Sequence, residues 1–309
     1  MESQFITWKG LQAVRLIGGG YEAVVLPEFG ANCISLIHQS SGNQLLRVPQ
    51  TQQLLCKDYN VYGLPLLFPP NRVRDGKFIF EGREYRFPIN EPNRGNHLHG
   101  FLSQTTFTVI GGGVFLYEAT EKNGYLDFPH AFSIQRKYEL CDDGLLHTIA
   151  VTNRSELNMP VGIGVHATLR VDPLENCQLQ IDTLYQWEID TTRMLPTGER
   201  FVNTPLLTAL RSGVFNPVAQ PISAMLECRP GSEMVLCSVK DRWRCVPDPA
   251  FRFIMLWNGG GTDGFVCVEP QSWVTDAPNL PLPSEVTGLR ALAPGDTVQF
   301  NLRYYYMKE

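Results

Sequence analysis

The sequence lacks the features that would place the protein in a membrane or on a nucleic acid. Among its 309 residues, no apolar stretch approaches the ~18 residues that a membrane-spanning helix needs. The net charge is −5 and no lysine/arginine run stands out, so we expect neither nucleic acid nor a membrane as a partner. The opening MESQFITWKG has no basic segment followed by an apolar one, and a secretory signal is therefore not expected.

Paired cysteine motifs are also missing. None of the eight cysteines belongs to a CxxC pair, and several lie in apolar runs, such as Cys237 in EMVLCSV and Cys267 in GFVCVEP. We interpret them as free and mostly buried thiols. Together with the missing signal, unpaired cysteines predict a reducing, cytoplasmic location.

Several catalytic motifs and long helical periodicity are missing as well. The chain has no GxSxG elbow, GxxxxGK[ST] phosphate loop or HExxH motif. The glycine triplets at 111–113 and 259–261 are followed by no helical pattern, so we interpret them as turns and not as a dinucleotide loop.

What the sequence does contain is alternation of apolar and polar residues with period two. KFIFEGREYRF (77–87) predicts a hairpin, and residues 132–153 predict another around Asp-Asp-Gly. The 27 glycines and 22 prolines are spread as turn residues. We therefore predict an all-β fold of packed antiparallel sheets with few short helices, forming one domain over residues 1–309. Further predicted strands lie at 178–190, 233–241, 251–257, 264–270 and 297–307.

Two of the six histidines lie close together in NRGNHLHGF (93–101). On a strand, His97 and His99 would point to the same side, as a metal-binding pair requires. The residues that follow, 100–104, include no carboxylate to complete such a site. A structural, hydrogen-bonded role is the alternative, and we predict no metal.

Three other residues could carry chemistry. His166 lies in the apolar strand MPVGIGVHATLRV, where a hydrogen-bonded core histidine is the alternative to a catalyst. Glu269 ends the apolar run GFVCV, and a buried carboxylate is costly unless it is paired or functional. It could equally be a solvated strand end. Arg72, in the loop before a strand, could be simply exposed.

Taken together and in this order, several segments resemble the aldose 1-epimerase (galactose mutarotase-like) family. They are FGANCISL, PPNRVRDGKFIFEGREYRF, NHLHGF, MPVGIGVHATLRV, MLPTGE and VCVEPQSWVTDAPN, and they extend over most of the chain. The resemblance implies a β-supersandwich fold. It also implies interconversion of the α and β anomers of an aldose without metal or organic cofactor, with a small sugar as the partner of a monomer or homodimer.

The resemblance also implies roles for individual residues. Glu269 matches the family's general base, and His166 matches its general acid. His99, in the Leu-His-Gly position, matches a second histidine near the sugar's ring oxygen. Arg72 matches the arginine that binds sugar hydroxyls, and Asn71 is its neighbour in the same motif. His97 corresponds to no such position, so it is expected to be structural or at the rim of the site.

The sequence departs from many galactose mutarotases in two places. Residues 204–226 contain no carboxylate, although an aspartate in this region binds sugar hydroxyls in many hexose mutarotases. His-Gly-Phe replaces His-Gly-Gly and is similar to the hexose-6-phosphate mutarotase branch. Arg74, Arg94 or Arg211 could hold a phosphate there, although nothing in their spacing demands it and a solvated surface role is the favoured alternative for each.

Two other classes of function stay open beside an epimerase. One is a non-catalytic carbohydrate-binding β-sandwich, although pure binding needs stacking aromatics more than an acid and a base. The other is a glycoside hydrolase, which requires two carboxylates flanking the bond to be cleaved. Only Glu269 is a convincing carboxylate in the sequence.

Overall fold

The computed structural model describes residues 1–120, 122–172, 174, 176–239 and 241–307, and it is mostly β, as the alternation predicts. Among these residues, no helix is long and apolar enough to cross a membrane. The α-helices are short: α1 (Gln52–Lys57), α2 (Pro205–Ser212) and α3 (Ser284–Thr287).

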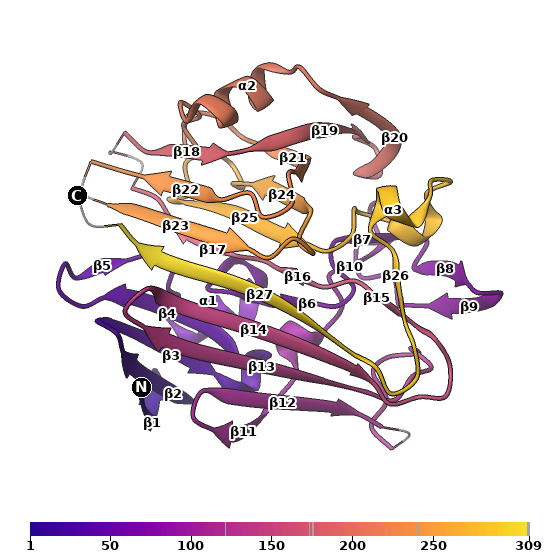
Figure 1. Cartoon of the computed structure of the whole chain (residues 1–309), viewed down its shortest axis with the longest axis horizontal. Coiled ribbons are helices and arrows are strands. Elements are labelled where there is room, and N and C mark those ends of the chain that lie inside the picture. Colours follow the sequence, from indigo (N-terminus) through magenta and orange to yellow (C-terminus); the bar gives the residue numbers. More distant parts are fainter. Residues whose placement is uncertain (121, 173, 175, 240, 308–309) are drawn as a thin grey trace.

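Most strands belong to three antiparallel sheets (Figure 1). The N-terminal sheet is a meander whose strands follow one another in chain order. They are β1 (Glu2–Trp8), β2 (Leu11–Gly18), β3 (Tyr21–Leu26), β4 (Asn32–His38) and β5 (Asn43–Gln44).

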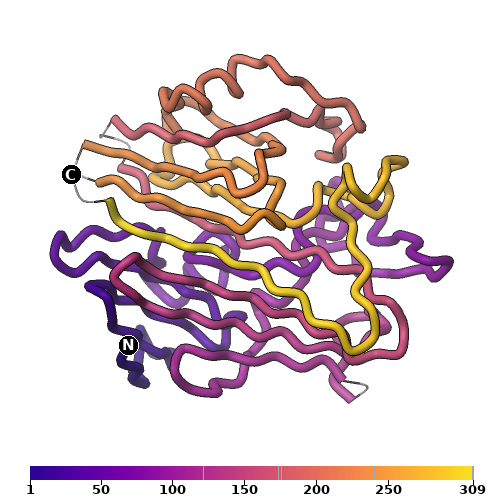
Figure 2. Tube along the Cα trace, viewed as in Figure 1, coloured from indigo at the N-terminus to yellow at the C-terminus, as the bar shows by residue number. Residues whose placement is uncertain are grey.

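The second sheet, called the β14 sheet, has the strand order β11-β12-β13-β14-β27-β23-β22-β18. Figure 2 shows the C-terminal strand of the chain, β27, in yellow. It runs between the magenta β14 and the orange β23, and it pairs with both. The strands are β11 (Thr108–Gly111), β12 (Val114–Ala119), β13 (Phe132–Cys141), β14 (Gly144–Asn153), β18 (Gln178–Ile181), β22 (Met234–Cys237), β23 (Arg242–Pro247) and β27 (Thr297–Tyr306).

The third sheet, called the β25 sheet, has the order β20-β19-β21-β24-β25-β16-β6, with β17 also paired to β25. Three two-stranded pairs accompany the large sheets: β7 with β10, β8 with β9, and β15 with β26. The strands of the β25 sheet are β6 (Leu66–Leu67), β16 (Gly164–Val165), β17 (Thr168–Arg170), β19 (Thr183–Asp190), β20 (Leu195–Phe201), β21 (Ser223–Cys228), β24 (Phe253–Trp257) and β25 (Phe265–Gln271). Those of the pairs are β7 (Arg72–Arg74), β8 (Lys77–Phe80), β9 (Arg83–Arg86), β10 (Asn96–Leu98), β15 (Met159–Val161) and β26 (Arg290–Leu292).

The predicted strands correspond to these elements, with one informative difference. The run 178–190 divides at Asp182 into β18 and β19, which belong to different sheets. Leu179, Ile181 and Thr183 are all buried, so the alternation continues across the division and cannot reveal it. Of the predicted strand 233–241, β22 forms the first part, and residue 240 lies outside the described residues.

The three sheets share one large cluster of buried apolar side chains. Val25 of the N-terminal sheet, Ile134 of the β14 sheet, and Val266 and Val268 of the β25 sheet all belong to it. Successive side chains of a strand point to opposite faces. Glu269 is therefore directed to the other face of the β25 sheet, away from this core.

The cysteines agree with the expectation of free thiols. Cys33, Cys228 and Cys267 are buried and unpaired, whereas Cys56 and Cys141 are free and exposed. Burial raises the pKa of the Cys33 thiol to about 12, and therefore this side chain behaves as a small apolar group.

Candidate active site

A histidine and a carboxylate meet on the β25 sheet. His166 lies between β16 and β17, two short strands that both pair with β25. Its backbone N–H donates to the carbonyl of Pro65 at 2.9 Å. Glu269 faces it from β25, with Oε1 3.3 Å from His166 Nε2. Two residues far apart in the sequence are thus brought within contact distance.

The glycines before His166 have a packing role beside this pair. A Cβ atom at Gly162 would lie 2.3 Å from the ring of Trp273, and one at Gly164 would lie 2.8 Å from Pro70 Cβ. Any larger residue would displace these neighbours, so the GIGVH segment needs its glycines to bring His166 against β25.

Burial dominates the electrostatics of the pair. It raises the pKa of Glu269 to about 8, although a hydrogen bond from Gln271 and the charge of Arg72 act in the opposite direction. Burial also lowers the pKa of His166 to about 4. Between these two values the pair holds one proton in total. Such a pair can accept a proton from one ligand atom and donate a proton to another.

His99 lies beside the pair, at the end of β10. Its ring centroid is 5.2 Å from that of His166, and the two rings are nearly perpendicular, at 80°. His99 has a left-handed backbone (φ 66°), as does Asn71 (φ 58°), and its N–H donates to the Asn71 carbonyl at 2.9 Å. Burial and the nearby charges of His166 and Arg72 hold the pKa of His99 well below its ordinary value, so the ring is neutral at pH 7.

Gly100 completes this turn. Its φ of 65° follows directly on the left-handed His99, and a Cβ atom there would lie 2.0 Å from the carbonyl oxygen of Phe68. The Leu-His-Gly motif therefore has a structural reason: the chain must turn sharply after Leu98 to bring the His99 ring to the site.

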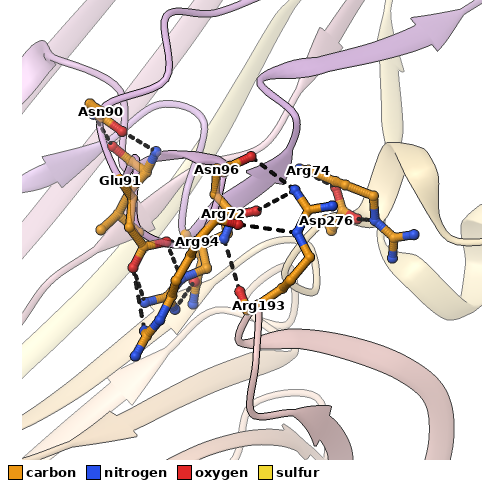
Figure 3. Close-up of polar contacts among 11 residues, drawn as sticks. Arg72, Arg74, Asn90, Glu91, Arg94, Asn96, Arg193 and Asp276 are labelled. Carbon is orange, nitrogen blue, oxygen red and sulfur yellow. Dashed lines mark hydrogen bonds and ion pairs between the residues drawn. The ribbon is translucent and has the colours of Figure 1, made fainter.

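Arg72 is held in place by a carboxylate that the sequence did not reveal (Figure 3). Its Nε and Nη2 donate to the two oxygens of Glu91, at 2.8 and 2.9 Å, and Nη1 donates to Asn71 Oδ1 at 3.3 Å. Burial acts to raise the pKa of Glu91, but the bonds from Arg72 and Asn96 outweigh it, and the pKa lies below its ordinary value. Glu91 is thus a permanent anion that fixes the guanidinium.

A cavity of about 450 Å³ joins these groups, within the range for small-molecule sites. Among the described residues that line it, Glu269 is the sole carboxylate, and Trp257 and Met255 from β24 form an apolar wall. The lining residues are Asn60, Val61, Asn71, Arg72, Arg94, Leu98, His99, His166, Met194, Ser223, Met255, Trp257 and Glu269.

Arg193, in the turn between β19 and β20, links this turn by hydrogen bonds to the segment that carries Arg94 (Figure 3). Its guanidinium donates to the carbonyls of Arg94 and Gly95, at 3.1 and 2.9 Å, and to Asp75 Oδ1 at 2.7 Å. Asn96 Nδ2 donates back to the Arg193 carbonyl at 2.8 Å. These contacts position the neighbouring Met194 at the cavity wall.

A buried aspartate from the VTDAPN segment supports β7, the strand that carries Arg72. Asp276 Oδ1 accepts from the backbone N–H of Arg74 at 2.9 Å and from Asn279 Nδ2 at 2.7 Å. Asp276 Oδ2 lies 3.3 Å from Arg74 Nε (Figure 3). The aspartate therefore joins the loop after β25 to the strand of Arg72.

His97 has a different environment from His99. Its Nδ1 donates to the Pro88 carbonyl at 2.7 Å, and its Nε2 accepts from the N–H of Gly100 at 3.1 Å. Both ring nitrogens are engaged, and β10 ends at Leu98, so the two histidines do not form a pair of ligands on one strand face. His97 is structural, as expected.

The three arginines considered for a phosphate differ in position. Arg94 lines the cavity, and its side chain is 33% exposed. Arg74 is ion-paired with Asp276. Arg211 donates to the carbonyls of Thr183, Leu184 and Val202 and secures α2 instead.

Sequence reasoning missed the residues that complete the walls of the site. They come from loops or from strand positions that look like ordinary core. An aromatic residue at the end of the β24 pattern was the one available signal, for Trp257. The missed lining residues are Asn60, Val61, Leu98, Met194, Ser223, Met255 and Trp257. Glu91 was also missed; it is not a lining residue but holds Arg72.

The fold and the site define a β-sandwich protein with a buried histidine–carboxylate pair in the wall of a cavity large enough for a small molecule. Comparison with known proteins shows the family. Residues 12–305 match the aldose 1-epimerase family. A galactose mutarotase-like protein from Clostridium acetobutylicum, of known crystal structure, is 29% identical, with a TM-score of 0.91 over 100% of this chain and 98% of that chain. The chain belongs to the aldose 1-epimerase family.

Two more distant relatives are similar to the chain, one in structure and one in sequence. A GalM/aldose epimerase homologue from C. elegans is 20% identical, with a TM-score of 0.77 and 99% of each chain covered. An uncharacterized Escherichia coli K12 protein, YphB, is 24% identical over 262 residues, which cover 79% of this chain and 83% of YphB. The galactose mutarotase-like fold implied by the sequence motifs is confirmed.

Proposed function

We propose that the protein is a mutarotase that interconverts the α and β anomers of an aldose by general acid–base catalysis. The observation that carries the proposal is the contact of His166 Nε2 with Glu269 Oε1, at 3.3 Å, in the wall of the cavity. A hemiacetal bears its hydroxyl and its ring oxygen on the same carbon. An acid and a base in contact with each other can therefore act on both atoms at once.

The proposed steps conserve protons. The single proton of the pair first moves from Glu269 to His166 across their 3.3 Å contact, which leaves Glu269 ionised and His166 protonated. Glu269 then removes the proton from the C1 hydroxyl while His166 gives its proton to the ring oxygen, and the C1–O5 bond breaks to leave the open-chain aldehyde. Rotation about C1–C2 presents the other face of the aldehyde, and the same two residues act in reverse on closure. An acid and a base each typically contribute about 10²–10⁴-fold.

The remaining residues bind and orient the sugar in this proposal. His99 hydrogen-bonds near the ring oxygen, while Arg72 and Asn71 hold hydroxyls. The apolar wall of Trp257 and Met255 suits the C–H face of a pyranose. Because Arg72 is already fixed by Glu91, it loses little freedom when the sugar binds.

A sugar with an anionic substituent is the second candidate substrate, and Arg94 favours it. Arg72 and Arg94 share one carboxylate, that of Glu91, and Arg94 Nη1 lies 3.4 Å from it. Two guanidinium groups and one anion leave positive charge at the cavity wall. A phosphorylated aldose would place its phosphate there.

The test is direct observation of anomeric exchange. Freshly dissolved α-D-glucose, α-D-galactose and glucose 6-phosphate are followed by NMR or polarimetry, with and without the protein. Faster exchange than in buffer alone is expected for at least one of these sugars. Sugar binding without any acceleration across a broader panel would instead indicate a carbohydrate-binding protein.

A further inference from the structure

One buried group next to the acid–base pair has no part in the proposed chemistry. Cys267 lies two residues before Glu269 on β25, and its side chain therefore points to the same face of the sheet. The thiol is fully buried, and its Sγ lies 3.4 Å from Thr168 Oγ1. Across the strand pairs it faces Trp257 and Thr168.

The thiol brings a third potential ligand to the pair. A ring nitrogen of His166, Sγ of Cys267 and a carboxylate oxygen of Glu269 all lie within 4.8 Å of one another. We propose that these three residues form a binding site for Zn²⁺ or a similar thiophilic divalent cation, and that the occupied site is catalytically inactive. The inhibition, though not the metal binding, rests on the proposed function.

The ligand set and its spacing fit zinc. Zinc binds imidazole nitrogen, thiolate sulfur and carboxylate oxygen, whereas Mg²⁺ and Ca²⁺ prefer oxygen alone. Bonds of about 2.0–2.3 Å in a tetrahedron separate ligand atoms by about 3.3–3.7 Å. His166 Nε2 and Glu269 Oε1, at 3.3 Å, already meet this spacing. The thiol must approach by roughly 1 Å, which small side-chain rotations supply.

The surroundings favour reversible binding over a resident metal. A histidine that binds metal is normally oriented by a hydrogen bond to its other nitrogen. His166 Nδ1 has no such partner among the described residues. Losing an orienting partner typically weakens metal binding by about 10–100-fold. The cation must also displace the thiol proton, and the carboxyl proton where one is present.

Occupancy would remove both catalytic groups together. The metal takes the lone pair of His166 and the carboxylate of Glu269, so neither can exchange a proton with a sugar. The fourth position of a tetrahedral ion would face the cavity, where His166 and Glu269 are lining residues. Metal and sugar would then compete for the same space.

Cobalt provides a readout that does not require enzymatic activity. Co²⁺ replaces Zn²⁺ in such sites and gives a thiolate-to-metal charge-transfer band in the near ultraviolet. The full-length protein is titrated with Co²⁺, and then with Zn²⁺, which should abolish the band. Anomeric exchange is measured in parallel with added Zn²⁺ and after EDTA.

Cys267→Ser and Cys267→Ala test the thiol itself, and Ala removes the ligand without burying a hydroxyl. Both variants should lose the band, need at least about tenfold more Zn²⁺ for inhibition, and keep the metal-free exchange rate. Cys141→Ser, which alters an exposed thiol, should behave as the parent protein.

A band that persists without Cys267, or equal inhibition of parent and variants, would overturn the site. If no sugar is epimerised, the proposed function fails, yet the band and its dependence on Cys267 still decide the metal site.

Discussion

Two carboxylates near the same cavity, the partly buried Glu91 and the fully buried Glu269, have opposite electrostatic environments. Glu91 accepts two hydrogen bonds from Arg72 and one from Asn96, and Arg94 lies 3.4 Å away. Glu269 has a 3.3 Å hydrogen bond from Gln271 and the neutral ring of His166 beside it. The pKa of the first lies below its ordinary value, and that of the second is raised to about 8.

The difference shows that burial and hydrogen-bonding partners together decide whether a carboxylate near the cavity stays ionised. A carboxylate held between two arginines stays ionised through the physiological range and serves as a fixed anchor. A carboxylate with few donors is costly to ionise, so it readily gains or loses a proton when a ligand arrives. Glu91 thus suits a positioning role, and Glu269 suits proton transfer.

The largest effect is expected from Glu269→Gln. Glutamine keeps the size of the side chain and its hydrogen bonding but cannot accept a proton. Anomeric exchange should fall by about 10²–10⁴-fold, while sugar binding is retained. Steady-state polarimetry measures the rate, and calorimetric titration with sugar measures the affinity. A fully active variant would show that Glu269 is not the base.

The pH dependence tests the single proton of the pair. Below about 4 both His166 and Glu269 are protonated, so the base is missing; above about 8 both are deprotonated, so the acid is missing. Activity as kcat/KM should form a plateau between these values and fall about tenfold per pH unit outside them.

The control for this profile is circular dichroism at each pH, which separates titration of the pair from unfolding. Activity that keeps rising well above pH 8 would mean that the pair needs no proton, and the contrast between the two carboxylates would lose its functional meaning.

Glu91→Gln applies the same substitution to the other carboxylate. Glutamine offers one neutral acceptor oxygen, so Arg72 would lose the negative charge and at least one of its two hydrogen bonds to residue 91, while the bond to Asn71 Oδ1 stays. We expect a loss of roughly tenfold in kcat/KM, mainly through a higher KM, because about 1–2 kcal/mol of orientation is lost. Saturation kinetics beside Glu269→Gln separate the two roles. An equal loss of kcat in Glu91→Gln and Glu269→Gln would contradict the assignment of a positioning role to Glu91 and proton transfer to Glu269.

Much of the fold could be predicted from the sequence, and so could the two residues, His166 and Glu269, that meet in the cavity wall. Alternation marked the strands, and the ordered motifs indicated that His166 and Glu269 belong to one site. Three facts could not be predicted. The division of a strand at Asp182 is hidden because the alternation continues across it. The bond between Arg72 and Glu91 is hidden because it joins a strand to a loop, and no sequence pattern relates the two residues. The left-handed backbone of His99 is not marked by a glycine at that position.

His97 and His166 differ in the same way as the two carboxylates, because one has all its hydrogen-bonding atoms engaged and the other does not. The variant His97→Asn tests this difference, and it has the smallest expected effect on activity. His97 uses both ring nitrogens within the fold, whereas His166 Nδ1 has no partner among the described residues. Asparagine can keep the bond to the Pro88 carbonyl but leaves the buried N–H of Gly100 without an acceptor, at a cost of about 1–3 kcal/mol.

The melting temperature of His97→Asn should fall by about 2–4 °C per kcal/mol, while kcat/KM at 25 °C stays close to that of the parent protein. Differential scanning calorimetry and polarimetry on the same sample give both quantities. The Gly100 N–H adjoins the His99 turn, so a modest rise in KM would be consistent with a structural role. If the variant melts at the same temperature as the parent protein but no longer catalyses anomeric exchange, His97 would have a catalytic and not a structural role.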